Sequence, residues 1–157
     1  MINPILFFHT ELTNDESPNG RIEIWESGNW PDCRCQGRYI ALSGLPGWQT
    51  WDDQNSKGKG PIPRPDVAGV GCYQVATNPH FVPASEQPGI AGNFYEIFPS
   101  YVENGRGLFG IHLDANVPGT AGCVGIVNAP AWEDFQNKMA GIATLGINRI
   151  PLIVGYS

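Results

Sequence analysis

Positive charge is scarce in this sequence. Only 9 of the 157 residues are Lys or Arg, against 15 Asp or Glu, which gives a formal net charge of −6. Proteins that bind nucleic acid usually carry a basic stripe or patch, and the sequence shows none. An acidic chain is also not attracted to anionic membranes or anionic wall polymers. We therefore expect neither nucleic acid nor a membrane among its partners.

Long apolar runs are missing as well. No run approaches the roughly 20 residues that a transmembrane helix needs. The first residues (M-I-N-P-I-L-F-F-H) have no basic region, and their apolar run is too short for a signal peptide. We therefore expect a protein that is made in the cytoplasm without a signal peptide. Action in the periplasm or cell wall would then require separate delivery or cell lysis.

Metal-binding patterns are also absent. The chain has three histidines and neither an H-x-H nor an H-E-x-x-H motif, which argues against a zinc peptidase. Cys33 and Cys35 form a C-x-C pair, but no second pair or nearby histidine completes a site. We expect no metal, no cofactor and reduced cysteines.

Glycine and proline, in contrast, are abundant and spread along the chain, with 20 and 14 residues. They separate short apolar or alternating runs, a pattern that is typical of short strands joined by turns. The stretch 55–66 has too much Gly and Pro for regular structure. Strands are predicted at 5–10, 21–27, 37–43, 72–77, 94–98, 108–113, 123–128 and 150–156.

One segment near the C-terminus reads as a helix. Asn128 is a suitable N-cap, Pro130 suits the first turn, and Gly146 ends the pattern. We expect Glu133 and Asp134 to favour the helix dipole. The apolar residues at helical spacing are Trp132, Phe135, Met139 and Ile142. The sequence therefore predicts one mainly-β domain over residues 1–157, a sandwich or partly open barrel with this single helix.

The stretch 106–128 (R-G-L-F-G-I-H-L-D-A-N-V-P-G-T-A-G-C-V-G-I-V-N) carries the chemistry. It predicts a strand that ends near His112, then a Pro/Gly loop, then Gly122-Cys123 at the start of another strand. A thiol becomes a good nucleophile when a nearby base takes its proton. Small residues before the cysteine allow backbone N–H groups to approach a substrate carbonyl and form an oxyanion hole. Cys123 could instead be a small buried apolar residue.

These residues resemble the catalytic domain of the L,D-transpeptidase family (the YkuD-like fold). The match consists of His112, Thr120, Gly122, Cys123 and Val124, and weaker similarity extends from about Arg38 to the C-terminus. Many members have a second histidine where this chain has Ala121. Many also have an arginine or asparagine where it has Gly125, which shifts the expectation from wall synthesis towards wall cleavage or editing.

The resemblance implies a mechanism. His112 takes the proton of Cys123, and the thiolate attacks the carbonyl of the third residue of a stem tetrapeptide. The N–H groups of Gly122, Cys123 and Ala121 hold the oxyanion, and the thioester passes to an amine or to water. Thr120 would support this loop. Asp114 would orient the imidazole, bind a substrate amine or cap the loop.

Two further residues are candidates for binding substrate. Arg106 could hold a carboxylate with two hydrogen bonds, or form a structural ion pair. Tyr95 could line a groove, although aromatic residues at this density are more often core.

Two other functions compete. A papain-like wall amidase would use Cys72, which precedes His112 in sequence but heads a strand-like run rather than a helix. A non-catalytic wall-binding module would tolerate loss of Cys123. The expected partners are peptidoglycan peptides, together with an immunity protein or a holin-type delivery partner, and we expect a monomer.

Overall fold

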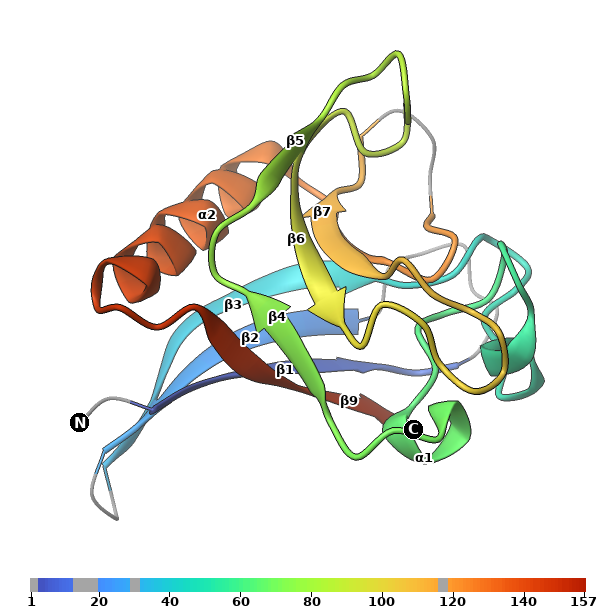
Figure 1. The fold of residues 1–157 in the computed structure, drawn as a ribbon, viewed down its shortest axis with the longest axis horizontal. Coiled ribbons are helices and arrows are strands. Elements are labelled where there is room, and N and C mark those ends of the chain that lie inside the picture. The colour runs from blue at the N-terminus through green and yellow to red at the C-terminus, as the bar shows by residue number, and fades with distance from the viewer. Residues whose placement is uncertain (1–2, 13–19, 29–31, 116–118) are drawn as a thin grey trace.

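The computed structural model describes residues 3–12, 20–28, 32–115 and 119–157 (Figure 1). Its strands are β1 (Asn3–Thr10), β2 (Gly20–Ser27), β3 (Cys33–Leu42), β4 (Tyr73–Ala76), β5 (His80–Val82), β6 (Gly92–Phe98), β7 (Gly110–Leu113), β8 (Val124–Ile126) and β9 (Arg149–Tyr156). The helices are α1 (Pro65–Ala68) and α2 (Ala129–Thr144), and Asp52–Asn55 forms a 3-10 turn, η1.

The strands join in one sheet in the order β4-β9-β1-β2-β3-β8-β7-β6-β5. Strand β4 also pairs with β6, which brings the two ends of the sheet together and makes it partly ring-like. Most neighbours are antiparallel, but β1–β9 and β7–β8 are parallel. The prediction of a mainly-β fold with one helix near the C-terminus is confirmed.

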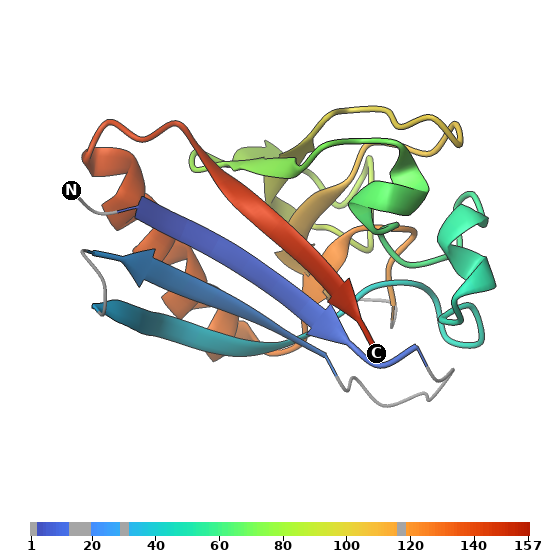
Figure 2. The ribbon, with the colours of Figure 1, turned by 90° about the horizontal axis from the view of Figure 1, so that it is seen from below.

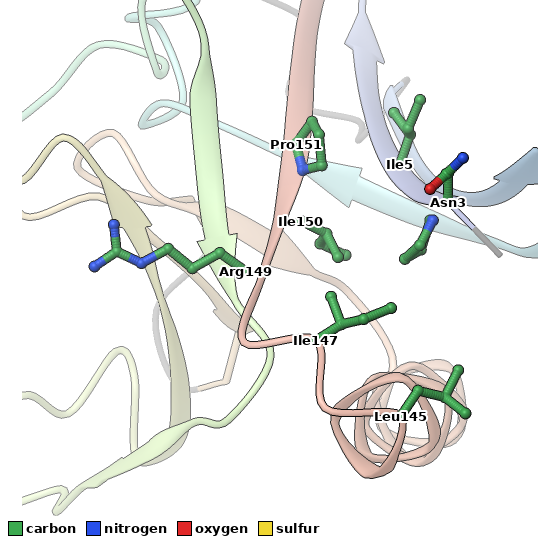
Figure 3. A pocket seen from close by; sticks show the side chains of 8 residues that line it. Asn3, Ile5, Leu145, Ile147, Arg149, Ile150 and Pro151 are labelled. Atoms are coloured by element: carbon green, nitrogen blue, oxygen red, sulfur yellow. The ribbon is translucent and has the colours of Figure 1, made fainter. Parts of the chain in front are cut away.

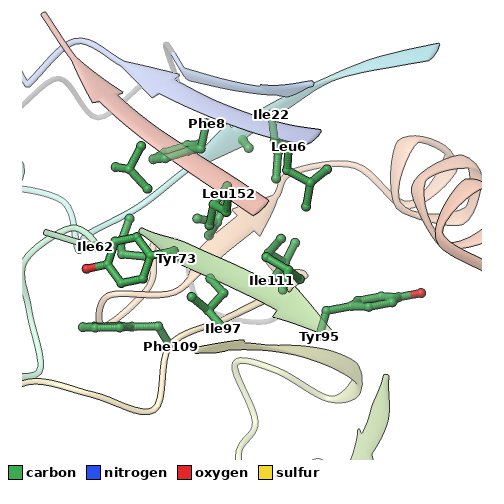
Figure 4. Packing of buried hydrophobic residues seen from close by; sticks show 14 of the residues in the cluster. Leu6, Phe8, Ile22, Ile62, Tyr73, Tyr95, Ile97, Phe109, Ile111 and Leu152 are labelled. Atoms are coloured by element: carbon green, nitrogen blue, oxygen red, sulfur yellow. The ribbon is translucent and has the colours of Figure 1, made fainter. Parts of the chain in front are cut away.

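The core lies between the two curled halves of this sheet. Leu6, Phe8 and Ile22 point inward from β1 and β2, and Ile97 and Ile111 face them from β6 and β7 (Figure 4). Alternate residues of β1 are buried, as expected for a strand with one face on the core. The other face of β9, β1, β2 and β3 is left uncovered by α2 (Figure 2).

Helix α2 closes the remaining side of this core. Asn128 caps it as predicted, since its side chain accepts a hydrogen bond from the N–H of Ala131 at 2.8 Å. Glu133 and Asp134 lie beyond the first turn, which contains no acidic residue, so their expected contribution to the helix dipole is wrong. The helix residues buried against the core are the predicted four, Trp132, Phe135, Met139 and Ile142.

Some boundaries differ from the prediction. Strand β3 begins at Cys33, earlier than expected, because its pairing with β2 continues past a bulge at Ile24/Trp25. The short strand β5 was not predicted, and the loop predicted over 55–66 ends in the first residues of α1. No helix of the described ranges is long and apolar enough to cross a membrane.

Candidate active site

His112 lies on β7, and Cys123 comes directly before β8, the parallel neighbour of β7. His112 pairs with Gly125, and Cys123 lies in the bend two residues before Gly125. Gly110 of β7 lies beside them, and the ring of Phe94 fills the space where its side chain would be.

The imidazole of His112 is held in one tautomer. Its Nδ1 lies 2.8 Å from the carbonyl oxygen of Leu113, which can only accept a hydrogen bond, so Nδ1 carries the proton. Nε2 is then the basic atom. Burial lowers the pKa of His112, and the bond to Leu113 offsets this only in part. The histidine is therefore neutral at pH 7 and suited to accept a proton.

Phe94 packs on His112 from the neighbouring strand. The two rings are nearly parallel, with centroids 6.2 Å apart, and His80 of β5 lies on Phe94 at 5.2 Å. A side chain at Gly110 would meet the Phe94 ring at 2.1 Å, so this glycine is needed for the ring to lie against β7. Sequence analysis assigned no site role to Phe94 or Gly110. A glycine inside a strand pattern was the available signal for such a close approach.

The thiol of Cys123 is half-buried and protonated. Its Sγ lies 3.8 Å from the carbonyl oxygen of Leu108. Burial raises the pKa of Cys123 to about 11, while a backbone hydrogen bond from Gly110 and the charge of Arg106 pull it down. A thiol of this kind is a poor nucleophile until a base removes its proton. Among the described residues, the contacts and charges that act on this thiol come from Leu108, Gly110 and Arg106 and not from His112.

The loop before Cys123 is fixed by Thr120, which is buried. Its hydroxyl accepts a hydrogen bond from the N–H of Gly44 at 3.2 Å and donates to the carbonyl of Cys123. Gly122 has a φ of +109°, a conformation that L side chains rarely adopt. The backbone bonds in the described turns and loops do not use the N–H groups of Ala121, Gly122 or Cys123, which are the predicted oxyanion donors.

Asp114 lies beside the loop. Its Oδ2 accepts from the N–H of Gly119 at 3.3 Å, which matches the loop-capping alternative. Its Oδ1 is buried without a partner among the described residues, and burial raises its pKa. The acceptor that orients His112 at Nδ1 is the Leu113 carbonyl, so an orienting role of Asp114 at that atom is wrong.

Gly125 lies in a space that has no room for a large side chain. A side chain there would meet Asp114 Cβ and Thr120 Cγ2, both at 3.0 Å. An arginine or asparagine at this position would require both neighbours to move.

The two predicted substrate-binding residues are both buried. Arg106 is 3% exposed, and its guanidinium donates to the carbonyls of Gln54, Gly60 and Pro61. Tyr95 is 2% exposed and packs edge-on against Trp132 and Phe135 under α2. Direct substrate contact by either side chain does not fit this burial.

Other candidate residues lie apart from this site. Cys72 is exposed and lies just before β4, which β6 separates from β7, so it is not placed to use His112. Within the described ranges, no three His, Cys, Asp or Glu side chains cluster as a metal site would need. A groove of about 850 Å³ lies between the end of α2 and strands β1 and β9, lined by Ile5, Leu145 and Pro151 among others (Figure 3). None of its lining residues is a predicted site residue.

Comparisons with known proteins give no relative. No family model, curated protein or solved structure matches this chain.

Proposed function

We propose that this protein is a cysteine-dependent acyl-transfer enzyme that acts on peptidoglycan stem peptides, as an L,D-transpeptidase-like peptidase or transferase. The observation that carries the proposal is the position of Cys123 directly before β8, with His112 on the adjacent parallel strand β7, beside a glycine loop with backbone donors. The mainly-β fold with one late helix is compatible with the resemblance in sequence.

The reaction would begin with proton transfer from the Cys123 thiol to Nε2 of His112. The sulfur attacks the carbonyl of the third stem residue, and the oxyanion takes hydrogen bonds from the N–H groups of residues 121–123. Collapse breaks the peptide bond, and the imidazolium gives its proton to the departing D-Ala amine. A water or a second amine then attacks the thioester, and the thiol is regenerated.

The pKa of Cys123 affects how the first step would run. Because burial raises this pKa to about 11, the thiol and the imidazole are both neutral at rest, unlike a preformed thiolate–imidazolium pair. The proton would therefore move as the sulfur attacks. Transfer within the site needs a side-chain rotation of Cys123 away from Leu108.

Wall cleavage or editing is the preferred form of this activity. The space at position 125 is occupied by Asp114 and Thr120, so the chain has no side chain there to hold a substrate carboxylate. We place the activity in the periplasm or cell wall, reached by delivery or lysis, with an immunity protein or holin-type protein as the accompanying partner.

The test is digestion of purified peptidoglycan with wild type and Cys123→Ala, with products read by mass spectrometry. We expect Cys123→Ala to lose turnover while it keeps the wild-type circular dichroism spectrum. Cys72→Ala is the matched control, since it removes an exposed thiol elsewhere and should leave turnover unchanged. Wild-type turnover by Cys123→Ala would overturn the catalytic assignment and favour a non-catalytic wall-binding module.

The same products separate the subclasses. Loss of terminal D-Ala indicates a carboxypeptidase, new cross-links indicate a transpeptidase, and opened cross-links indicate an endopeptidase. Loss of turnover in Cys72→Ala but not in Cys123→Ala would instead favour the papain-like alternative.

A further inference from the structure

Arg106 is a buried cation without a carboxylate partner. Its two terminal nitrogens donate to three backbone carbonyls, and its guanidinium lies 5.4 Å from the centre of the Phe109 ring. None of the ion pairs between described residues includes it. Carbonyls satisfy its hydrogen bonds but leave its net charge uncompensated, which is costly in a buried position.

This charge lies directly behind the proposed oxyanion loop. A Cβ atom on Gly122 would come within 2.6 Å of Arg106 Nη2 and 2.8 Å of the Phe109 ring. Only glycine allows the guanidinium to approach this close, and the φ of +109° at Gly122 also favours glycine. The guanidinium of Arg106 therefore lies against the backbone of Gly122, directly before Cys123.

Cys123 is the group near Arg106 that can become negative during the reaction. The other ionisable groups that interact with it are Tyr73 and Tyr156, and burial raises the pKa of both phenols. Tyr73 donates to the carbonyl of Pro63 and Tyr156 to that of Ile62, so both are held as neutral donors. A thiolate or oxyanion at Cys123 would supply a negative charge that compensates the positive charge of Arg106.

We propose that Arg106 is a positioning residue whose buried charge stabilises negative charge at Cys123 and at the Gly122–Cys123 backbone. The proposal rests on the proposed function for its catalytic meaning, but the electrostatic effect is a property of the folded chain alone. It replaces the expectation that Arg106 binds a substrate carboxylate. The positive field would act on the thiolate and the oxyanion from the interior side, where Arg106 is buried.

A purely structural role predicts something different. Arg106 also ties the 3-10 turn η1 and residues 60–61 to the site, because its three acceptors belong to that segment. If this tie were its whole contribution, Lys and Gln would be similarly poor replacements, since neither reproduces the guanidinium geometry. If charge matters, Lys should preserve the effect that Gln loses.

The experiment measures the thiol without any wall substrate. Cys33, Cys35 and Cys72 are replaced by Ser in the full chain, so that Cys123 is the remaining thiol, and its alkylation by iodoacetamide is followed from pH 7 to 11. We expect R106Q to raise the pKa of Cys123 by at least about one and to slow alkylation at pH 8.5 roughly tenfold. R106K should stay within about threefold of the parent. Arg34→Gln, an exposed change of the same charge, is the control and should have no effect.

Two outcomes would overturn the proposal: an R106Q thiol that titrates like the parent, or an R106K thiol that titrates like R106Q. If R106Q fails to fold, Cys123→Glu and Cys123→Lys are compared by thermal unfolding at pH 7. Both side chains are charged and similar in length, so both carry the cost of burying a charge, and they differ in the sign that faces Arg106. We expect Cys123→Glu to have the higher melting temperature, and a lower melting temperature than that of Cys123→Lys would contradict the proposal. These experiments use no peptidoglycan. The proposal for Arg106 can therefore be contradicted while Cys123-dependent wall turnover is observed, and it can be supported while no wall turnover is observed.

Discussion

The long-strand region (β9, β1, β2 and β3) and the short-strand region (β5 to β8) are built differently. The four long strands have eight to ten residues each and no residue with positive φ. Strands β5, β7 and β8 have three or four, and residues with positive φ cluster around them, including Ala91, Leu108 and Gly122. Strained backbone is retained where the surrounding structure enforces it, often at functional sites.

The buried charged groups of the two regions also differ, in whether they have partners of opposite charge. Glu23 is buried on the uncovered face of the long-strand region, and it is paired with both Arg21 and Arg38. In the short-strand region, Asp114 has a buried oxygen without a partner among the described residues, and Arg106 has no counter-ion there. In the long-strand region the buried Glu23 has ion-pair partners, whereas the short-strand region keeps a charge without a described counter-ion near Cys123, the proposed nucleophile. The comparison predicts that changes in the first affect stability and changes in the second affect chemistry.

The largest expected effect is on turnover. His112→Gln removes the proposed base but keeps a neutral side chain of similar size, so we expect the rate of muropeptide processing to fall at least about 10³-fold with little change in the unfolding midpoint. His80→Gln is the control, because that histidine is exposed on β5. Equal rates for the two variants would remove His112 from the mechanism.

The next effect is on stability. Phe8 is 1% exposed in β1 and meets Tyr156 edge-on, so Phe8→Ala should lower the free energy of unfolding by about 3–5 kcal/mol. Urea titration measures this. Turnover per folded molecule should stay at the wild-type level, and a large loss of turnover in the folded fraction would break the division between the regions. Phe81→Ala, at a site 70% exposed, should change stability by less than about 0.5 kcal/mol.

A smaller effect is expected at Glu23. Burial raises the pKa of its carboxyl, but the hydrogen bonds from Arg38 and Arg21 outweigh this and lower it overall. A lowered pKa means that the ion pairs stabilise the fold above about pH 4.5 and that this contribution is lost as the pH falls through the folded-state pKa. Glu23→Gln should cost about 1–2 kcal/mol at pH 7 and less at pH 3, measured by urea titration. A cost that does not depend on pH would show that charge is irrelevant there.

The smallest effect is the pH dependence that His112 gives to stability. Because burial lowers its pKa, the unfolded state binds a proton more readily, and stability should fall as the pH drops from 7 towards 5. His112→Gln should lack this part of the slope. Comparison with that variant also cancels the opposite contribution of Asp114, whose raised pKa favours the protonated fold at lower pH. Parallel slopes in melting temperature would contradict the buried neutral imidazole.

Local patterns in the sequence determined the type of most elements. The cap at Asn128, the spacing from Trp132 to Ile142 and the strand predicted at 5–10 each express a preference of nearby residues, which the fold keeps. The proposed nucleophile and base were also predicted from a motif, because a strand, a glycine loop and a second strand follow one another through short connections between residues 112 and 123. A strand as short as β5, with three residues, is too short to show the alternation of apolar and polar residues by which strands are predicted.

What the tertiary structure decided is the environment of those residues. The sequence cannot tell whether an arginine near a motif reaches solvent, and only the packing of η1 and residues 60–61 over Arg106 makes it an interior cation. Likewise, the Leu113 carbonyl fixes the tautomer of His112, and burial raises the pKa of Cys123. These properties depend on which distant segments cover a side chain. The sequence therefore determines which residue types are available for the proposed chemistry, while the fold determines the burial and the neighbouring charge that set their pKa values.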